Sequence, residues 1–173
     1  AYVAANFGRT TLLRDVLLPA GGDPNEGDIY EISPAQLAIR MKGNTGGGCD
    51  TLVVLLEHGG IDPNGEVFDT WRGPTTLPHQ ACMEGDASAV EVLLKYGANV
   101  NATDEESGIT PCMVATSVVN RNVDEYGLCL GALVRGAKQQ GVALTACLVA
   151  PDWPCVLFTP YSSRSVDGTL ISA

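Results

Sequence analysis

The chain has 173 residues, which is enough for one domain or for one array of small repeats. Apolar residues make up 45% of it and charged residues 17%, a balance that excludes a wholly disordered acidic chain. The formal net charge of −10 argues against nucleic acid or an anionic membrane surface as the main partner. The longest apolar stretch, 142–150, is about half the roughly 20 residues that a membrane-spanning helix needs, so we expect no membrane insertion.

A short loop motif recurs three times, each time after an apolar run with helical spacing. The copies lie at Gly22–Asn25, Ile61–Asn64 and Ala98–Asn101, and a fourth apolar run, Leu128–Val134, ends near Gly136. Each run leads to a glycine, and glycine readily adopts the left-handed conformation that ends many helices. Each run therefore predicts a helix that stops at its glycine.

A second motif, Ser or Thr close to Pro, precedes the last three of these runs. It reads Ser33–Ala38, Thr76–Ala81 and Thr110–Ala115. A hydroxyl side chain caps the unpaired N–H groups at a helix start, and proline suits the first turn. Each unit therefore predicts a helix, a short turn, a second helix and a loop that resembles a hairpin.

This unit resembles the ankyrin repeat, whose pattern is Thr-Pro-Leu-His-x-Ala followed by a Gly-Ala-Asp-x-Asn ending. The best match is 76–104, where His79 stands at the family's histidine position and Gly85 stands between the helices. In this copy the order Leu77-Pro78 is swapped relative to the family.

The other copies depart from the pattern at single places. The first starts inside its first helix and carries one extra residue before Gly21. The second carries a glycine-rich insertion, Gly43–Gly48, between its helices, and in the fourth Val119–Asp124 replaces the short turn. The resemblance is carried by the repetition of the pattern over residues 1–137 rather than by any one copy.

The resemblance implies an all-α fold, an ankyrin-repeat solenoid of stacked helix-turn-helix units with hairpin-like loops. One helix pair cannot bury its apolar face alone, so about four units are expected to stack around a continuous core. The expected boundaries are about 1–28, 29–68, 69–104 and 105–137. Residues 138–173 do not repeat, and we expect a C-terminal cap with one helix over Gly141–Ala150, followed by an apolar tail that contains prolines.

The tail has too much apolar surface to be left in water. Between Trp153 and Tyr161 it carries several large apolar side chains, and burying each one stabilises by roughly 1.5–3 kcal/mol. The tail is expected either to cover the open end of the last repeat or to bind a partner. We favour the first interpretation because the ends of repeat arrays need covering.

Residues suited to catalysis or metal binding are few. His79 and Cys82 share one helix face, but in the resembled family that histidine is structural. The loop Asp23–Asp28 has Pro34 where a calcium loop needs glutamate, and the six cysteines form no C-x-x-C pair. We expect no catalytic residue, no cofactor, no metal and no enzyme activity. We expect the cysteines to be buried thiols rather than disulfides. Free thiols indicate an intracellular compartment, and we favour the cytoplasm over an organelle.

Proteins that resemble the ankyrin family bind partners through loop tips and the first-helix face, which line a concave surface. The residues at these positions here are mostly apolar, a composition typical of interfaces. They are Phe7, Ile29, Tyr30, Met41, Trp71, Arg72, Met83, Glu105 and Glu106. We expect Trp71 and Tyr30 to anchor an apolar helix or an extended segment of another protein. The acidic charge would favour a basic partner.

The first hypothesis is a non-catalytic protein–protein interaction module, either a soluble adaptor or inhibitor or a structural subunit of a larger assembly. The second is the substrate-targeting domain of a longer enzyme, such as a kinase or ubiquitin ligase, because the chain starts inside a repeat. The third is a regulatory array that senses redox state through Cys49 in the glycine-rich insertion.

Overall fold

The computed structural model describes residues 1–30, 32–41, 48–58, 60–69, 73–104, 108–117 and 123–145. The helices are α1 (Tyr2–Asn6), α2 (Thr10–Leu12) with its π-helical continuation η1 (Leu13–Leu17), α3 (Pro34–Arg40), α4 (Gly48–Glu57), α5 (Leu77–Met83), α6 (Ala87–Lys95), α7 (Pro111–Ser117) and α8 (Val123–Gln140). Strands β1 (Glu66–Asp69) and β2 (Gly73–Thr76) form an antiparallel hairpin in which Glu66 pairs with Thr76.

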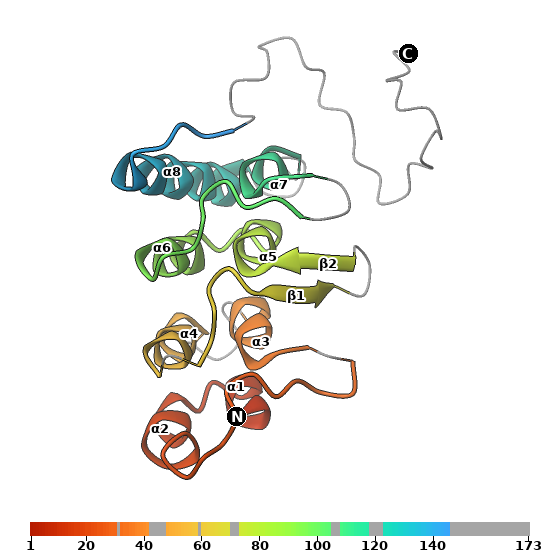
Figure 1. Ribbon diagram of the computed structural model, residues 1–173, viewed down its shortest axis with the longest axis vertical. Helices are drawn as coiled ribbons and strands as arrows, with labels where there is room; N and C mark the ends of the chain where they lie inside the picture. The colour runs from red at the N-terminus through yellow and green to blue at the C-terminus, as the bar shows by residue number, and fades with distance from the viewer. Residues whose placement is uncertain are drawn as a thin grey trace.

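The helices stack in two layers along one axis (Figure 1). In one layer α1, α3, α5 and α7 contact one another in turn, and in the other α2, α4, α6 and α8 do so. The β1–β2 hairpin extends from the start of α5 on the side away from the second layer. The all-α solenoid of stacked helix pairs that the sequence predicts is therefore confirmed.

Side chains cap some of the helix starts. The hydroxyl cap predicted at Thr76 is wrong, because the Thr76 hydroxyl bonds the His79 ring instead of a backbone amide of α5. The Ser33 hydroxyl accepts a hydrogen bond from the Gln36 amide (3.3 Å), and the Gln36 side chain accepts one from the Ser33 amide (2.8 Å). This capping box satisfies two amides that would otherwise lack partners at the start of α3. Asp86 does the same for α6, because its carboxylate accepts from the amides of Ser88 and Ala89.

The core is a stripe between the two layers, and small side chains let the first helices approach one another. Alanines are buried on α1, α3, α5 and α7, while branched apolar residues fill the second helices. The fully buried large apolar residues on the second helices are Leu13, Leu52, Leu55, Val90, Leu93 and Leu133. The same pattern recurs in each helix pair, as stacking requires.

Three asparagines at equivalent loop positions join each repeat to the next. The Asn64 side chain donates to the Gly97 carbonyl (3.1 Å) and accepts from the Asn99 amide (2.7 Å). Asn25 donates to the Gly60 carbonyl (2.6 Å), and Asn101 donates to the Ala143 carbonyl (2.7 Å) and accepts from the Thr145 amide. These bonds form an asparagine ladder, defined here as Asn25, Asn64 and Asn101, that fixes the spacing between repeats.

The side chain two positions before each ladder asparagine forms a hydrogen bond within its own loop. Asp23, Asp62 and Asn99 each accept from the amide two residues later, at 2.7–3.0 Å. These short side-chain turns hold the ladder asparagines in place. Gly21 and Gly97 end the preceding helices with φ of 87° and 93°, as the loop motif predicts. The stop predicted at Gly136 is wrong, because α8 continues to Gln140 and the glycine with a positive φ after it is Gly141.

The extra residue before Gly21 is absorbed by a widened helical turn. The Leu18 amide donates to the Leu13 carbonyl (3.0 Å), five residues back, and the segment Leu13–Leu17 is π-helical. A π-turn holds one more residue than an α-turn, so Leu13 and Leu18 both remain buried.

Some expectations need correction. Gly48 and Cys49 belong to the start of α4 rather than to the glycine-rich insertion, whose residues 43–47 lie outside the described part. Gly141–Thr145 is not helical, so the predicted helix over Gly141–Ala150 is wrong there. Cys112 is disulfide-bonded, whereas a thiol was expected. The tail beyond Thr145 lies outside the described residues.

We expect Asn64→Ala to lower the free energy of unfolding by about 1–2 kcal/mol, because two hydrogen bonds between repeats are lost. Urea denaturation of the full chain measures this change. Thr103→Ala is the control, since Thr103 is an exposed loop residue outside the ladder. Equal stabilities for the two variants would contradict the role given to the ladder.

Candidate partner-binding surface

A single carboxylate holds the loop tip that precedes α3. One Asp28 oxygen accepts from the amides of Tyr30 (2.8 Å) and Ile32 (3.1 Å), and the other accepts from the Tyr2 hydroxyl (2.9 Å). The Asp28 amide in turn donates to the Ile32 carbonyl (3.2 Å). Tyr30 and Ile32 are thus tied to Asp28, and Asp28 is tied to α1, without any partner protein.

The environment of Asp28 favours its charged form. Desolvation acts to raise its pKa, but hydrogen bonds from Ile32, Tyr30 and Tyr2 outweigh it and hold the pKa below the ordinary 3.8. Burial raises the pKa of the Tyr2 hydroxyl most, and the hydrogen bond to Asp28 raises it further. The three hydrogen bonds that the Asp28 carboxylate accepts from Tyr30, Ile32 and Tyr2, called here the Asp28 clamp, are therefore all formed at neutral pH.

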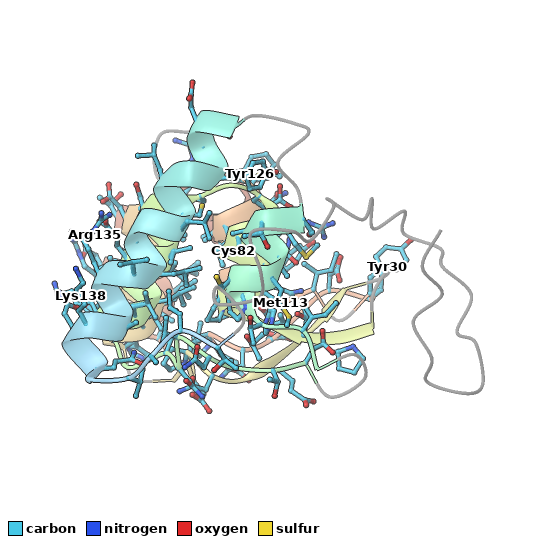
Figure 2. The ribbon with its side chains drawn as sticks, turned by 90° about the horizontal axis from the view of Figure 1, so that it is seen from above. Tyr30, Cys82, Met113, Tyr126, Arg135 and Lys138 are labelled. Carbon is cyan, nitrogen blue, oxygen red and sulfur yellow. The ribbon has the colours of Figure 1, made fainter. Side chains whose placement is uncertain are left out.

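The predicted apolar residues around this tip are exposed. Ile29 is 88% exposed and Tyr30 61%, and Phe7 at the end of α1 is exposed to a similar degree. Figure 2, which looks down the stack, shows Tyr30 projecting beyond the helix pairs on the side of α7 rather than α8. Large apolar side chains on an ordered loop are the type of surface that proteins use as interface anchors.

The two predicted methionines differ from these residues. Met41 and Met83 are only partly exposed, and Met83 packs against the core. The Tyr126 hydroxyl from α8 donates to the Met83 carbonyl at 3.1 Å, which fixes the end of α5. Arg40 and Glu84 lie beside the methionines and approach one another to 4.0 Å. This part of the first-helix face is a mixed surface rather than an apolar one.

Other predicted site residues lie outside the described part of the chain. These are Trp71, Arg72, Glu105 and Glu106. Trp71 and Arg72 belong to the connection between β1 and β2, so the structure places the hairpin but not its tip.

A cleft of about 340 Å³ lies between the first helix of the second repeat and the β1–β2 hairpin. Its lining includes the apolar residues Ala35, Ile61 and Leu77 and the acidic residues Asp62 and Glu66. This cleft could not be predicted from the sequence, because only folding brings the two loops together. Its combination of apolar and acidic lining residues matches a segment that carries both apolar and basic side chains.

The chain matches the family described as ankyrin repeats (3 copies) over residues 1–104. It belongs to the ankyrin repeat family. It is 35% identical over 132 residues to human protein phosphatase 1 regulatory subunit 27, a match that spans 70% of this chain and 84% of that protein. It is also 35% identical over 75 residues to the mouse protein of the same name, across 43% of this chain and 47% of that protein.

The histidine of the ankyrin motif is structural in this protein. His79 is buried, and its ring nitrogens lie 2.8 Å from the Thr76 hydroxyl and 2.8 Å from the Ile109 carbonyl of the next repeat. Cys82 is also buried, and desolvation, with a smaller contribution from nearby Cys129, raises its thiol pKa well above the ordinary value. A buried neutral thiol is a poor nucleophile, so this pair is not a catalytic arrangement.

Two further features of the described ranges concern metal binding and membrane insertion. No cluster there brings three or more His, Cys, Asp or Glu side chains together as metal ligands. Among the described helices, none combines the length and apolar character needed to cross a bilayer.

The first repeat of this ankyrin protein has an apolar outer face that sequence reasoning missed. Val3, Leu12 and Val16 are exposed there. In later repeats the residues at their positions are buried, except that Val92 is only partly buried, and two of them, Thr51 and Gly136, contact the preceding repeat directly. Comparison of the repeats position by position could have found this face, because those positions carry the contacts between repeats.

We expect the Asp28 clamp to open in acid. A carboxylate whose pKa is lowered by folding stabilises the folded loop above its unfolded pKa, and this contribution is lost as the pH falls through the lower folded value. The amide chemical shifts of Tyr30 and Ile32 should therefore titrate below pH 3.8. The same shifts in Asp28→Asn should show no such transition; an unchanged transition would contradict the clamp.

We expect His79→Ala to destabilise the protein by about 3 kcal/mol, since it leaves a cavity and removes a bridge between two repeats. Thermal and urea denaturation measure the change. His58→Ala is the matched control, because His58 is exposed near the end of α4. A loss below 0.5 kcal/mol, the range of ordinary surface substitutions, would rule out the bridging role.

Proposed function

We propose that this ankyrin-repeat protein is a non-catalytic binding subunit that recruits another protein through its loop-tip side. The observation that carries the proposal is the Asp28 clamp, which presents Ile29 and Tyr30 to solvent on an ordered loop. Anchors held in one conformation lose less entropy on binding than anchors on a free loop. Nothing in this role needs a catalytic group.

We further propose that the partner is the catalytic subunit of a protein phosphatase. Support comes from the similarity to protein phosphatase 1 regulatory subunit 27 of human and mouse. The net charge of −10 and the carboxylates at the cleft favour a basic surface on that partner. The chain would then act as an adaptor that positions the catalytic subunit, in an intracellular compartment.

The role of structural subunit in a larger assembly, which the sequence left open, would use the same surface. It differs from the adaptor role only in how permanent the complex is. Trp71, Arg72, Glu105 and Glu106 stay predicted contacts in either case.

A second candidate is the targeting region of a longer protein. The observation that favours it is the apolar outer face of Val3, Leu12 and Val16, whose chemistry fits a further helix pair stacked against α1 and α2. The full-length transcript tests this candidate. Upstream codons for another repeat, and for a catalytic domain, would support it over a free-standing adaptor.

We expect Tyr30→Ala to weaken binding to the protein phosphatase 1 catalytic subunit by about 30-fold, the effect of removing one interface anchor. Isothermal titration calorimetry with the full chain gives the dissociation constant. Leu128→Ala is the matched control, because Leu128 on α8 is exposed to 62%, against 61% for Tyr30.

The outcomes separate the parts of the proposal. A loss confined to Tyr30→Ala would support both the partner and the surface. Equal affinities for the two variants would reject the loop-tip surface while keeping the partner. Absence of binding by the unmodified chain would reject the phosphatase, and a lysate capture with the same pair of variants would then test the surface alone.

A further inference from the structure

The last repeat, α7 and α8, presents an outer face at the end of the stack (Figures 1 and 2). The Thr-Pro motifs align α7 with α5, so that Met113 stands at the position of His79 and Thr116 at that of Cys82. His79 is 1% exposed because the next repeat covers it, whereas Met113 is 36% exposed. Thr116 is exposed as well, while Cys82 is buried.

The second helices show the same contrast. α6 and α8 end in the same backbone bond, from the Ala98 amide to the Leu93 carbonyl and from the Val142 amide to the Ala137 carbonyl, each 3.0 Å. This equivalence places Val134 at the position of Val90. Val90 is fully buried and Val134 is 40% exposed. The outer face of α7 and α8 therefore corresponds to the face of α5 and α6 that the next repeat covers. Met113 and Val134 are apolar side chains on this face.

The shape of this outer face suits a large flat side chain. Gly127, Gly131 and Val134 share one face of α8 by their spacing, and Leu130 beside them is only partly buried. A Cβ atom at Gly127 would meet nothing within 4 Å, whereas one at Gly131 would lie 3.3 Å from the Arg135 guanidinium. The helix surface is therefore open at Gly127, with the Arg135 side chain beside it at Gly131, and an aromatic ring fits against the backbone at Gly127.

The described part of the chain ends at Thr145, beside the start of α7. The Thr145 amide donates to the ladder residue Asn101, and the Thr145 carbonyl lies 3.5 Å from the Thr110 hydroxyl at the start of α7. The following residues include Trp153, Leu157 and Phe158. The eight residues that follow Thr145, up to and including Trp153, can span up to roughly 27 Å, which is also about the length of an 18-residue helix such as α8.

We propose that residues 153–161 dock on the outer face of α7 and α8 and cover Met113, Val134 and Leu130. The segment would serve in place of a further repeat and close the apolar stack. A tethered segment is at high local concentration and so needs little buried area. A second copy would need about 1,200 Å² or more, which the few exposed apolar residues of this face do not supply. The proposal does not depend on the proposed function.

The chain has two tryptophans, Trp71 and Trp153. The test uses the full chain with Trp71→Phe, so that all tryptophan fluorescence comes from Trp153. We expect Trp153 fluorescence to be shielded from acrylamide, and Val134→Asp to raise its quenching several-fold because a charge on the docking face disfavours the apolar segment. Val16→Asp at the opposite end of the stack is the matched control and should leave the quenching unchanged.

Three results would overturn the proposal. One is that acrylamide quenches Trp153 in the chain with an unchanged docking face as strongly as it does in the urea-unfolded chain. Another is shielding that disappears on dilution, which would indicate a second copy. The last is equal effects of Val134→Asp and Val16→Asp. Circular dichroism checks that each variant is folded. If Val134→Asp does not fold, Met113→Asp takes its place, and the quenching of Trp153 must then rise in that variant in the same way.

Discussion

The whole structure depends on stacking helix pairs in register, because no pair can bury its apolar faces alone. The asparagine ladder gives this register a polar basis: each ladder side chain satisfies backbone groups of the following repeat. His79 adds a second tie from α5 to the Ile109 carbonyl. Since these ties link neighbouring repeats only, the array can tolerate an extra residue in one repeat, which η1 absorbs, without disturbing the others.

The same stacking leads to the binding surface. Register between repeats places the loop tips along one side of the stack, and local hydrogen bonds then decide how well each tip is ordered (Figure 1). Asp28 orders the tip before α3, so Ile29 and Tyr30 are exposed without being free to collapse onto the core. Stability and the proposed binding therefore use different residues of the same loop, so the tip can change its proposed partner contacts while the ladder is kept.

Much of the fold could be predicted from sequence, since Thr-Pro helix starts, glycine helix ends and loop asparagines each act through local chemistry. The structural role of His79 also followed from the resemblance to the family. Exposure could not be predicted in the same way: Tyr30 and Met83 are both predicted contact residues, but Met83 packs against the core while Tyr30 is exposed. The cleft and the outer face of Val3, Leu12 and Val16 depend on contacts between repeats, which no single motif contains.

The central claim is that the loop-tip side, rather than the second-helix side, binds the partner. Hydrogen–deuterium exchange of the full chain, with and without the protein phosphatase 1 catalytic subunit, tests it most directly. The account predicts slower exchange on binding at Asp28–Ser33 and at the ends of α1, α3 and α5. Slower exchange confined to α4, α6 and α8 would contradict it.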